Sequence, residues 1–118
     1  MNKPDVERLK RIVRIWDAAE AQIKERGITC ESLLEDEFSQ WALTTPLYNI
    51  GEQVFKLSTD FKAQYSELPW NVVAGMRHRL VHDYEGINWT IITEVIFDDM
   101  PGFVDQIRAI CKEAESES

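Results

Sequence analysis

Residues 70–84 read WNVVAGMRHRLVHDY, and at about 100° per residue the apolar side chains of this stretch fall on one side of a helix. The apolar arc consists of Trp70, Val73, Met76, Leu80 and Val81. The pattern predicts a helix over residues 70–81 that packs against other helices. The stretch also holds both histidines of the chain and two of its thirteen Lys and Arg residues. We therefore expect the functional site of the protein to lie in this stretch.

Arg77 lies inside this apolar arc, where an isolated charge would be strongly destabilising. It therefore needs a carboxylate partner, or a position at the lip of a groove or a subunit interface. His82 lies about 140° around an ideal helix from Arg77, so the two side chains diverge unless the helix ends or a second copy brings them together. Tyr84 would return to nearly the face of Arg77 before Gly86 breaks the helix.

The N-terminal region predicts an amphipathic helix that starts near Pro4 and stops at Gly27. Its apolar positions are Val6, Leu9, Ile12, Val13, Trp16, Ala19 and Ile23. Glu20 interrupts this stripe, either as the partner of a buried cation or because the stripe drifts onto Ala19.

A short turn capped by Thr29 precedes a longer predicted helix over residues 36–58, which Pro46 should kink or interrupt. We expect its inward side chains to be Phe38, Trp41, Ala42, Tyr48, Val54 and Phe55.

The remaining segments are also helical in pattern, with a short helix over residues 59–65 and a turn over residues 67–70. Asn88 should cap a final helical region that bends near Pro101 and Gly102. We expect residues 113–118 to form a frayed acidic tail. The fold class is therefore an all-α bundle of four to five helices, in a single domain over residues 1–112.

Charge is distributed unevenly along the chain, whose formal net charge is -8. Residues 1–26 carry seven Lys and Arg against five Asp and Glu, a net of +2, which leaves a net of -10 for residues 27–118. This balance disfavours loose, charge-driven binding of nucleic acid over the whole surface. Nucleic acid would need a local grip from Arg77 and Arg79, with help from Arg8, Lys10, Arg11 and Arg14, unless the basic residues of the first helix form only a solvated face.

Neither a signal sequence nor a membrane span is predicted, so we expect a cytoplasmic protein with no membrane partner. Cys30 and Cys111 lack metal-ligand spacing and are expected to be free thiols.

Arginine and histidine together suit chemistry on a phosphate, because arginine stabilises developing negative charge and histidine exchanges protons near neutral pH. His78 and His82 also have the spacing of two zinc ligands on a helix, although the chain has no third histidine. No serine or cysteine stands in a nucleophile motif, and no glycine-rich phosphate loop is present. We predict no cofactor and no metal.

The pattern Arg77, four residues, His82, one residue, Tyr84 resembles the R-x-x-x-x-H-x-Y motif of HepT-like toxins, a branch of the HEPN superfamily. Further segments share the likeness: Asn49-Ile50-Gly51-Glu52, Leu68-Pro69-Trp70 and Ala74-Gly75-Met76-Arg77. From about residue 41 to residue 107 the order and spacing are similar to those of the family, whereas the first helix is similar only in being amphipathic.

This resemblance implies a homodimer in which the motifs of both subunits line a cleft at the two-fold interface. It implies that Arg77 holds the scissile phosphate and that His82 acts as acid or base in metal-independent RNA cleavage. It also implies that Tyr84 accepts AMP from a partner, a minimal nucleotidyltransferase of the MntA type. The AMP would inactivate the toxin by adding negative charge and bulk beside Arg77.

Other residues around the motif have supporting roles in this interpretation. Glu52 is expected to support Arg77, and Arg79 to help grip RNA, whereas His78 is either a second proton carrier or a hydrogen-bonding residue. Glu85 stands where many relatives have an aromatic residue, which adds negative charge near the RNA path. The alternative function is therefore a binding module without nuclease activity that docks and regulates a nucleotidyltransferase.

Overall fold

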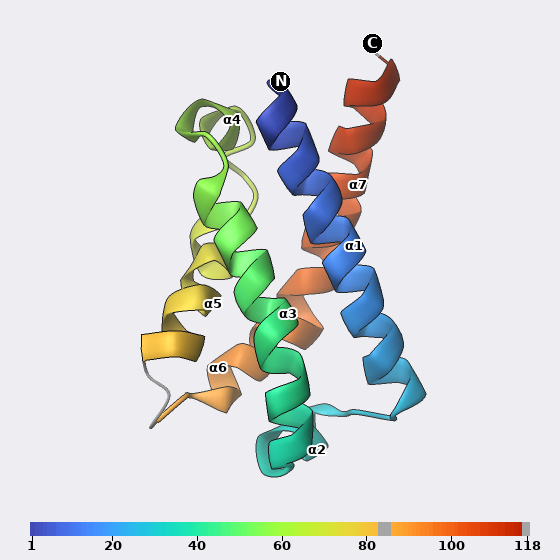
Figure 1. Ribbon diagram of the computed structural model, residues 1–118, viewed down its shortest axis with the longest axis vertical. Helices are drawn as coiled ribbons and strands as arrows, with labels where there is room; N and C mark the ends of the chain where they lie inside the picture. Colours follow the sequence, from blue (N-terminus) through green and yellow to red (C-terminus); the bar gives the residue numbers. More distant parts are fainter. Residues whose placement is uncertain (83–85, 117–118) are drawn as a thin grey trace.

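The protein is an all-α bundle in a computed structural model that describes residues 1–82 and 86–116 (Figure 1). The long helices are α1 (Lys3–Glu25), α3 (Glu37–Lys56) and α5 (Trp70–His82), together with a continuous C-terminal path through α6 (Trp89–Glu94), η1 (Val95–Asp99) and α7 (Met100–Ser116). Two helices of six residues each, α2 (Cys30–Glu35) and α4 (Thr59–Gln64), connect them. The prediction of an all-α bundle is confirmed for the described residues.

Side-chain caps explain where most of these helices begin. The side chains of Asn2, Thr29, Asp36, Ser58 and Asn88 each accept a hydrogen bond from a backbone N–H in the first turn of the helix that follows. The expected caps at Thr29 and Asn88 are therefore confirmed. At the end of α1, Gly27 adopts a φ of +62°, which a residue without a side chain reaches at little cost.

The core lies along the inner faces of the four long helical segments. α3 and α5 run antiparallel, as do α1 and α7, and the start of α1 and the end of α7 lie at the same end of the bundle as α4 (Figure 1). Fully buried side chains come from all of these segments and include Leu9, Ile12, Leu47, Ile50, Met76, Ile92, Phe103 and Ile107. In α1 the stripe does drift onto Ala19, which is buried, while Glu20 is partly exposed and pairs with Lys24.

The predicted inward face of α3 was mostly wrong. Val54 is buried and Tyr48 is half-buried, but Phe38, Trp41, Ala42 and Phe55 are exposed. The buried residues of this helix are instead Leu43, Leu47, Ile50, Gly51 and Val54. The error arose because α3 carries two apolar stripes, and the aliphatic one packs into the core.

In α5 the predicted arc holds at Trp70, Val73, Met76 and Leu80, which are all buried, but Val81 is exposed. A residue one position after Leu80 lies about 100° further around the helix, beyond the edge of the buried face.

Two further differences concern helix continuity. α3 continues through Pro46 without interruption, and the C-terminal helical path departs from α geometry at the π-helical η1, just before the expected bend at Pro101 and Gly102. α7 extends through Ser116, so residues 113–116 are helical where we expected a frayed tail, and residues 117–118 lie outside the described residues. Contacts with α1 accompany this extension, since the ammonium of Lys10 lies 3.9 Å from the carboxylate of Glu115. Among residues 1–82 and 86–116, no helix is both long and apolar enough to cross a membrane.

Candidate active site

Gly51 sets the distance between α3 and α5 at the position of Arg77. A Cβ atom at Gly51 would lie 2.9 Å from the backbone nitrogen of Arg77, 3.1 Å from its Cβ and 3.3 Å from the carbonyl oxygen of Val73. Real Cβ atoms essentially never approach backbone so closely, so the two helices can be this close only because residue 51 has no side chain. The backbone of Arg77 is therefore held against α3.

The guanidinium of Arg77 is positioned by two side chains of α3. Its Nη1 donates a hydrogen bond of 3.1 Å to Oε1 of Glu52, and its Cζ lies 3.7 Å from the centroid of the Phe55 ring. Glu52 and Phe55 are three residues apart, so both reach the same side of α3. Of the alternatives expected for Arg77, the structure shows the carboxylate partner, which is Glu52.

This arrangement uses only part of the hydrogen-bonding capacity of Arg77. A guanidinium carries N–H donors on three nitrogens, and only Nη1 donates within the described part of the chain. The side chain is 32% exposed, so its other donors can reach a ligand, while Glu52, at 19% exposure, also lies 3.6 Å from the ammonium of Lys56. Arg77 is thus held in place yet able to bind an anion.

The other predicted site residues are only partly described. His78 and Arg79 are exposed on α5, and His82 is the last residue of that helix. Tyr84, the predicted site of AMP attachment, and Glu85 lie outside the described residues. Within the two described ranges no three His, Cys, Asp or Glu side chains gather as a metal site, so the zinc alternative gains no further ligands there.

Sequence reasoning missed two features of the site. It gave Phe55 to the core and did not assign a packing role to Gly51, although the spacing of Glu52 and Phe55 could have placed both on the side of Arg77.

It also missed an exposed aromatic face on α3, which we define by Phe38, Trp41 and Phe55. Phe38 is 75% exposed, Trp41 61% and Phe55 53%, and the rings of Phe38 and Trp41 lie 5.3 Å apart in an edge-on arrangement. Because α3 and α5 are antiparallel, residues that follow Arg77 on α5 approach the end of α3 where this face begins (Figure 1).

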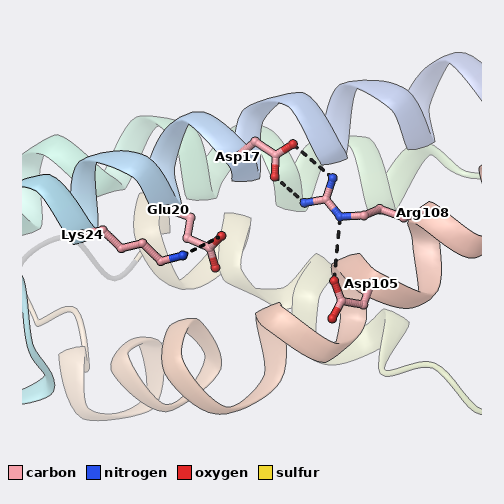
Figure 2. Close-up of polar contacts among 5 residues, drawn as sticks. All are labelled: Asp17, Glu20, Lys24, Asp105 and Arg108. Carbon is pink, nitrogen blue, oxygen red and sulfur yellow. Dashed lines mark hydrogen bonds and ion pairs between the residues drawn. The ribbon is translucent and has the colours of Figure 1, made fainter.

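A second arginine cluster joins α1 to α7 on another part of the molecule (Figure 2). Both Nη atoms of Arg108 donate to the carboxylate of Asp17, and Nε lies 3.8 Å from Asp105. The hydrogen bonds from Arg108 lower the pKa of Asp17 below its ordinary value of 3.8. On α7 of the same helix pair, burial raises the pKa of the Cys111 thiol. Cys111 and the exposed Cys30 are both free cysteines.

The fold and the site together match one class of protein. The family described as "Ribonuclease HepT-like" matches residues 6–110 of the chain, so this protein belongs to the HepT-like ribonuclease family, as the motif around Arg77 predicted.

Individual relatives are also named as ribonucleases. Over 85 residues the chain is 36% identical to the protein named "Putative RNase TTE0752" of Caldanaerobacter subterraneus subsp. tengcongensis, covering 72% of this chain and 76% of that one. Over 87 residues it is 31% identical to the "Probable ribonuclease HepT" of Thermococcus cleftensis, covering 74% and 79% of the two chains. No solved structure matches the chain.

Proposed function

We propose that this protein is a metal-independent endoribonuclease whose site contains Arg77 and His82. The observation that carries the proposal is the state of Arg77: Glu52 and Phe55 orient its partly exposed guanidinium, whose other donors make no hydrogen bond to residues 1–82 and 86–116. Such a fixed cation can stabilise charge that develops on a phosphate without reorganising during the reaction. Membership of a ribonuclease family makes RNA the substrate class.

The reaction that fits these residues uses the ribose 2′-hydroxyl as nucleophile. Its oxygen forms a bond to the neighbouring phosphorus, and the bond from phosphorus to the 5′-oxygen of the next nucleotide breaks. His82 takes the proton from the 2′-hydroxyl or gives one to the leaving oxygen, and Arg77 stabilises the negative charge on the phosphoryl oxygens. The products are a 2′,3′-cyclic phosphate and a 5′-hydroxyl.

We further propose that the active site is composite, with both motifs of a homodimer lining one cleft. The exposed aromatic face supports this arrangement, because Phe55, which contacts Arg77, is 53% exposed and the face continues along α3 to Trp41 and Phe38 at 61% and 75% exposure. Exposed aromatic side chains in a row are unusual on a surface that faces only water. Val81, 44% exposed on α5, adds apolar area close to the motif. A two-fold contact through this region would bring a second His82 towards each Arg77.

In the cell we propose that the protein acts in the cytoplasm as the toxin of a toxin–antitoxin pair. A minimal nucleotidyltransferase would neutralise it by transferring AMP to Tyr84, which lies two residues after His82. The added phosphate would compete for Arg77 and block RNA by repulsion and bulk.

The proposal is tested with purified protein whose unmodified Tyr84 has been verified by intact mass. Wild type and His82→Ala are incubated with RNA in excess EDTA, and the ends of the products are analysed. We expect cleavage by the wild type alone, with cyclic phosphate ends.

Equal cleavage by the variant would reveal a contaminating nuclease and overturn the assignment of His82. No cleavage by the wild-type protein with verified unmodified Tyr84 would favour the alternative, a binding module that docks and regulates the nucleotidyltransferase.

A further inference from the structure

A groove of about 360 Å³ lies between α1 and α3, on the flank of α3 that faces away from α5. Ala18, Ala42 and Pro46 contribute to a floor of small and apolar side chains, and Arg14, Arg26 and Asn49 contribute polar groups around it. Pocket sites of this kind, apolar with a few polar groups at fixed places, suit a flat ligand that carries charge at its edge.

The arginines along this groove have no carboxylate partner among the described residues. In that part of the chain Arg14 makes no ion pair, and Arg26 donates through Nε to the neutral amide of Gln22 at 2.9 Å. Arg8, which does not line the groove, donates to the neutral amide of Gln53 at 3.3 Å. Two lysines of α1 that do not line the groove are paired, Lys10 with Glu115 and Lys24 with Glu20. In a chain with a net charge of -8, cations left without acidic partners along one groove indicate an anionic ligand.

We infer that this groove binds a nucleotide of single-stranded RNA outside the reacting site, with a base against the apolar floor and phosphates on Arg14 and Arg26. Arginine is suited to phosphate because its planar donors can bind two oxygens at once. A base suits the floor because contact between flat apolar surfaces tolerates any sequence. The inference deepens the proposed function, on which it rests for the identity of the ligand as RNA.

The position of the groove also provides a path to Arg77. Arg8 contacts Gln53, and Gln53 directly follows Glu52, the residue that orients Arg77. A strand held by Arg14 and Arg26 that continues past Arg8 would reach the part of α3 that carries Glu52. The rest of the surface, with its excess of carboxylates, would repel RNA, so a separate grip increases the occupancy of the site.

The test measures binding of a fluorescein-labelled single-stranded RNA by anisotropy at several salt concentrations. The full chain is used with His82→Ala as background, so that the RNA stays intact and binding is separated from cleavage. We expect Arg14→Gln/Arg26→Gln to weaken binding and to lower the slope of log affinity against log salt by about 1.4, the change for two lost phosphate contacts on a single strand. Lys24→Gln/Lys112→Gln is the matched control, since it removes two positive charges from residues that do not line the groove and should leave the slope unchanged.

A second variant examines the floor without changing charge. Ala42 is exposed on α3, so Ala42→Met fills the groove while a good helix former remains at that position. We expect weaker RNA binding with an unchanged salt slope.

The possible results separate this inference from the proposed function. Cleavage by the wild-type protein with unchanged RNA affinity in Arg14→Gln/Arg26→Gln would keep the proposed function, leave the groove to a protein partner and overturn the inference. Binding that depends on the two arginines, in a protein that never cleaves RNA, would keep the inference and overturn the nuclease. An equal loss of RNA affinity in the lysine control would also overturn the inference that the groove binds RNA.

Discussion

Arg77 and Arg108 each link two long helices through a carboxylate, but they use their guanidinium groups differently. Arg108 donates with both Nη atoms to Asp17 and lies near Asp105 as well, so acidic groups surround it (Figure 2). Arg77 donates once to Glu52 and lies against the ring of Phe55. The first arrangement neutralises a cation, and the second orients a cation that can still bind an anion.

Exposure separates the two pairs further. The side chains of Arg108 and Asp17 are 41% and 49% exposed, so the pair is screened by water and contributes only about 0.2–1 kcal/mol to stability. Arg77 and Glu52 are 32% and 19% exposed, in a junction where helix packing leaves no space for a side chain at residue 51. A close helix contact can therefore fix a charged group for function, whereas a salt bridge between exposed side chains mainly joins two surfaces.

The largest expected difference between the pairs is in RNA cleavage. Arg77→Ala should lower kcat/KM by roughly 10²–10³, because it removes a preorganised donor to the transition state. Arg77→Lys should also lose much of the activity, since lysine keeps the charge but not the planar donors. Arg108→Ala should leave kcat/KM unchanged. Single-turnover cleavage of a labelled RNA measures all three, with circular dichroism to verify folding, and similar losses from Arg77→Ala and Arg108→Ala would remove the functional distinction.

The next largest effect concerns the contact between α3 and α5. Gly51→Val should destabilise the protein by about 3 kcal/mol, because the new side chain meets backbone atoms of Arg77 and Val73. Gly75→Ala, two residues before Arg77 on α5, is the control: nothing lies within 4 Å of its added Cβ. It should stabilise the helix by about 0.5–1 kcal/mol. Urea unfolding measures both, and a tolerated Gly51→Val would show that the close approach is not required.

A smaller effect is expected from neutralising each carboxylate while keeping its shape. Glu52→Gln should reduce kcat by about tenfold with little change in KM, because Arg77 loses its orientation but not its charge. Asp17→Asn should alter neither constant. Recovery of activity in Glu52→Asp would support a positioning role, whereas a change confined to KM in Glu52→Gln would contradict it.

The smallest effect is the dependence of stability on pH at the exposed pair. The pKa of Asp17 is lowered in the folded protein by its hydrogen bonds from Arg108. The ionised carboxylate therefore stabilises the folded state fully at pH values above its ordinary pKa of 3.8, and this stabilisation is lost as the pH falls through the lower pKa of the folded state. At neutral pH the free energy of unfolding of the wild type should exceed that of Asp17→Asn by up to about 1 kcal/mol. The difference should shrink as the folded carboxylate is protonated. Urea midpoints of the two proteins across this range measure it, and a difference that grows in acid would reverse the predicted sign.

The sequence alone determined the helical segments and the location of the motif. The apolar periodicity of residues 70–81, the stop at Gly27 and the caps at Thr29 and Asn88 depend on local geometry, which a short stretch of chain specifies by itself. The need of Arg77 for a partner also followed from local reasoning, because a charge inside an apolar arc is unfavourable without one.

Only the tertiary structure decided which stripe of α3 is buried and what surrounds Arg77. Phe38, Trp41 and Phe55 are as apolar as the buried Leu43 and Leu47, so composition could not choose between the stripes, whereas packing against α1 and α5 did. The role of Gly51 depends on the distance between helices, and the groove that Arg14 and Arg26 border exists only once α1 lies beside α3. Periodicity fixes each helix locally, but the contacts between helices depend on how segments distant in sequence fit together.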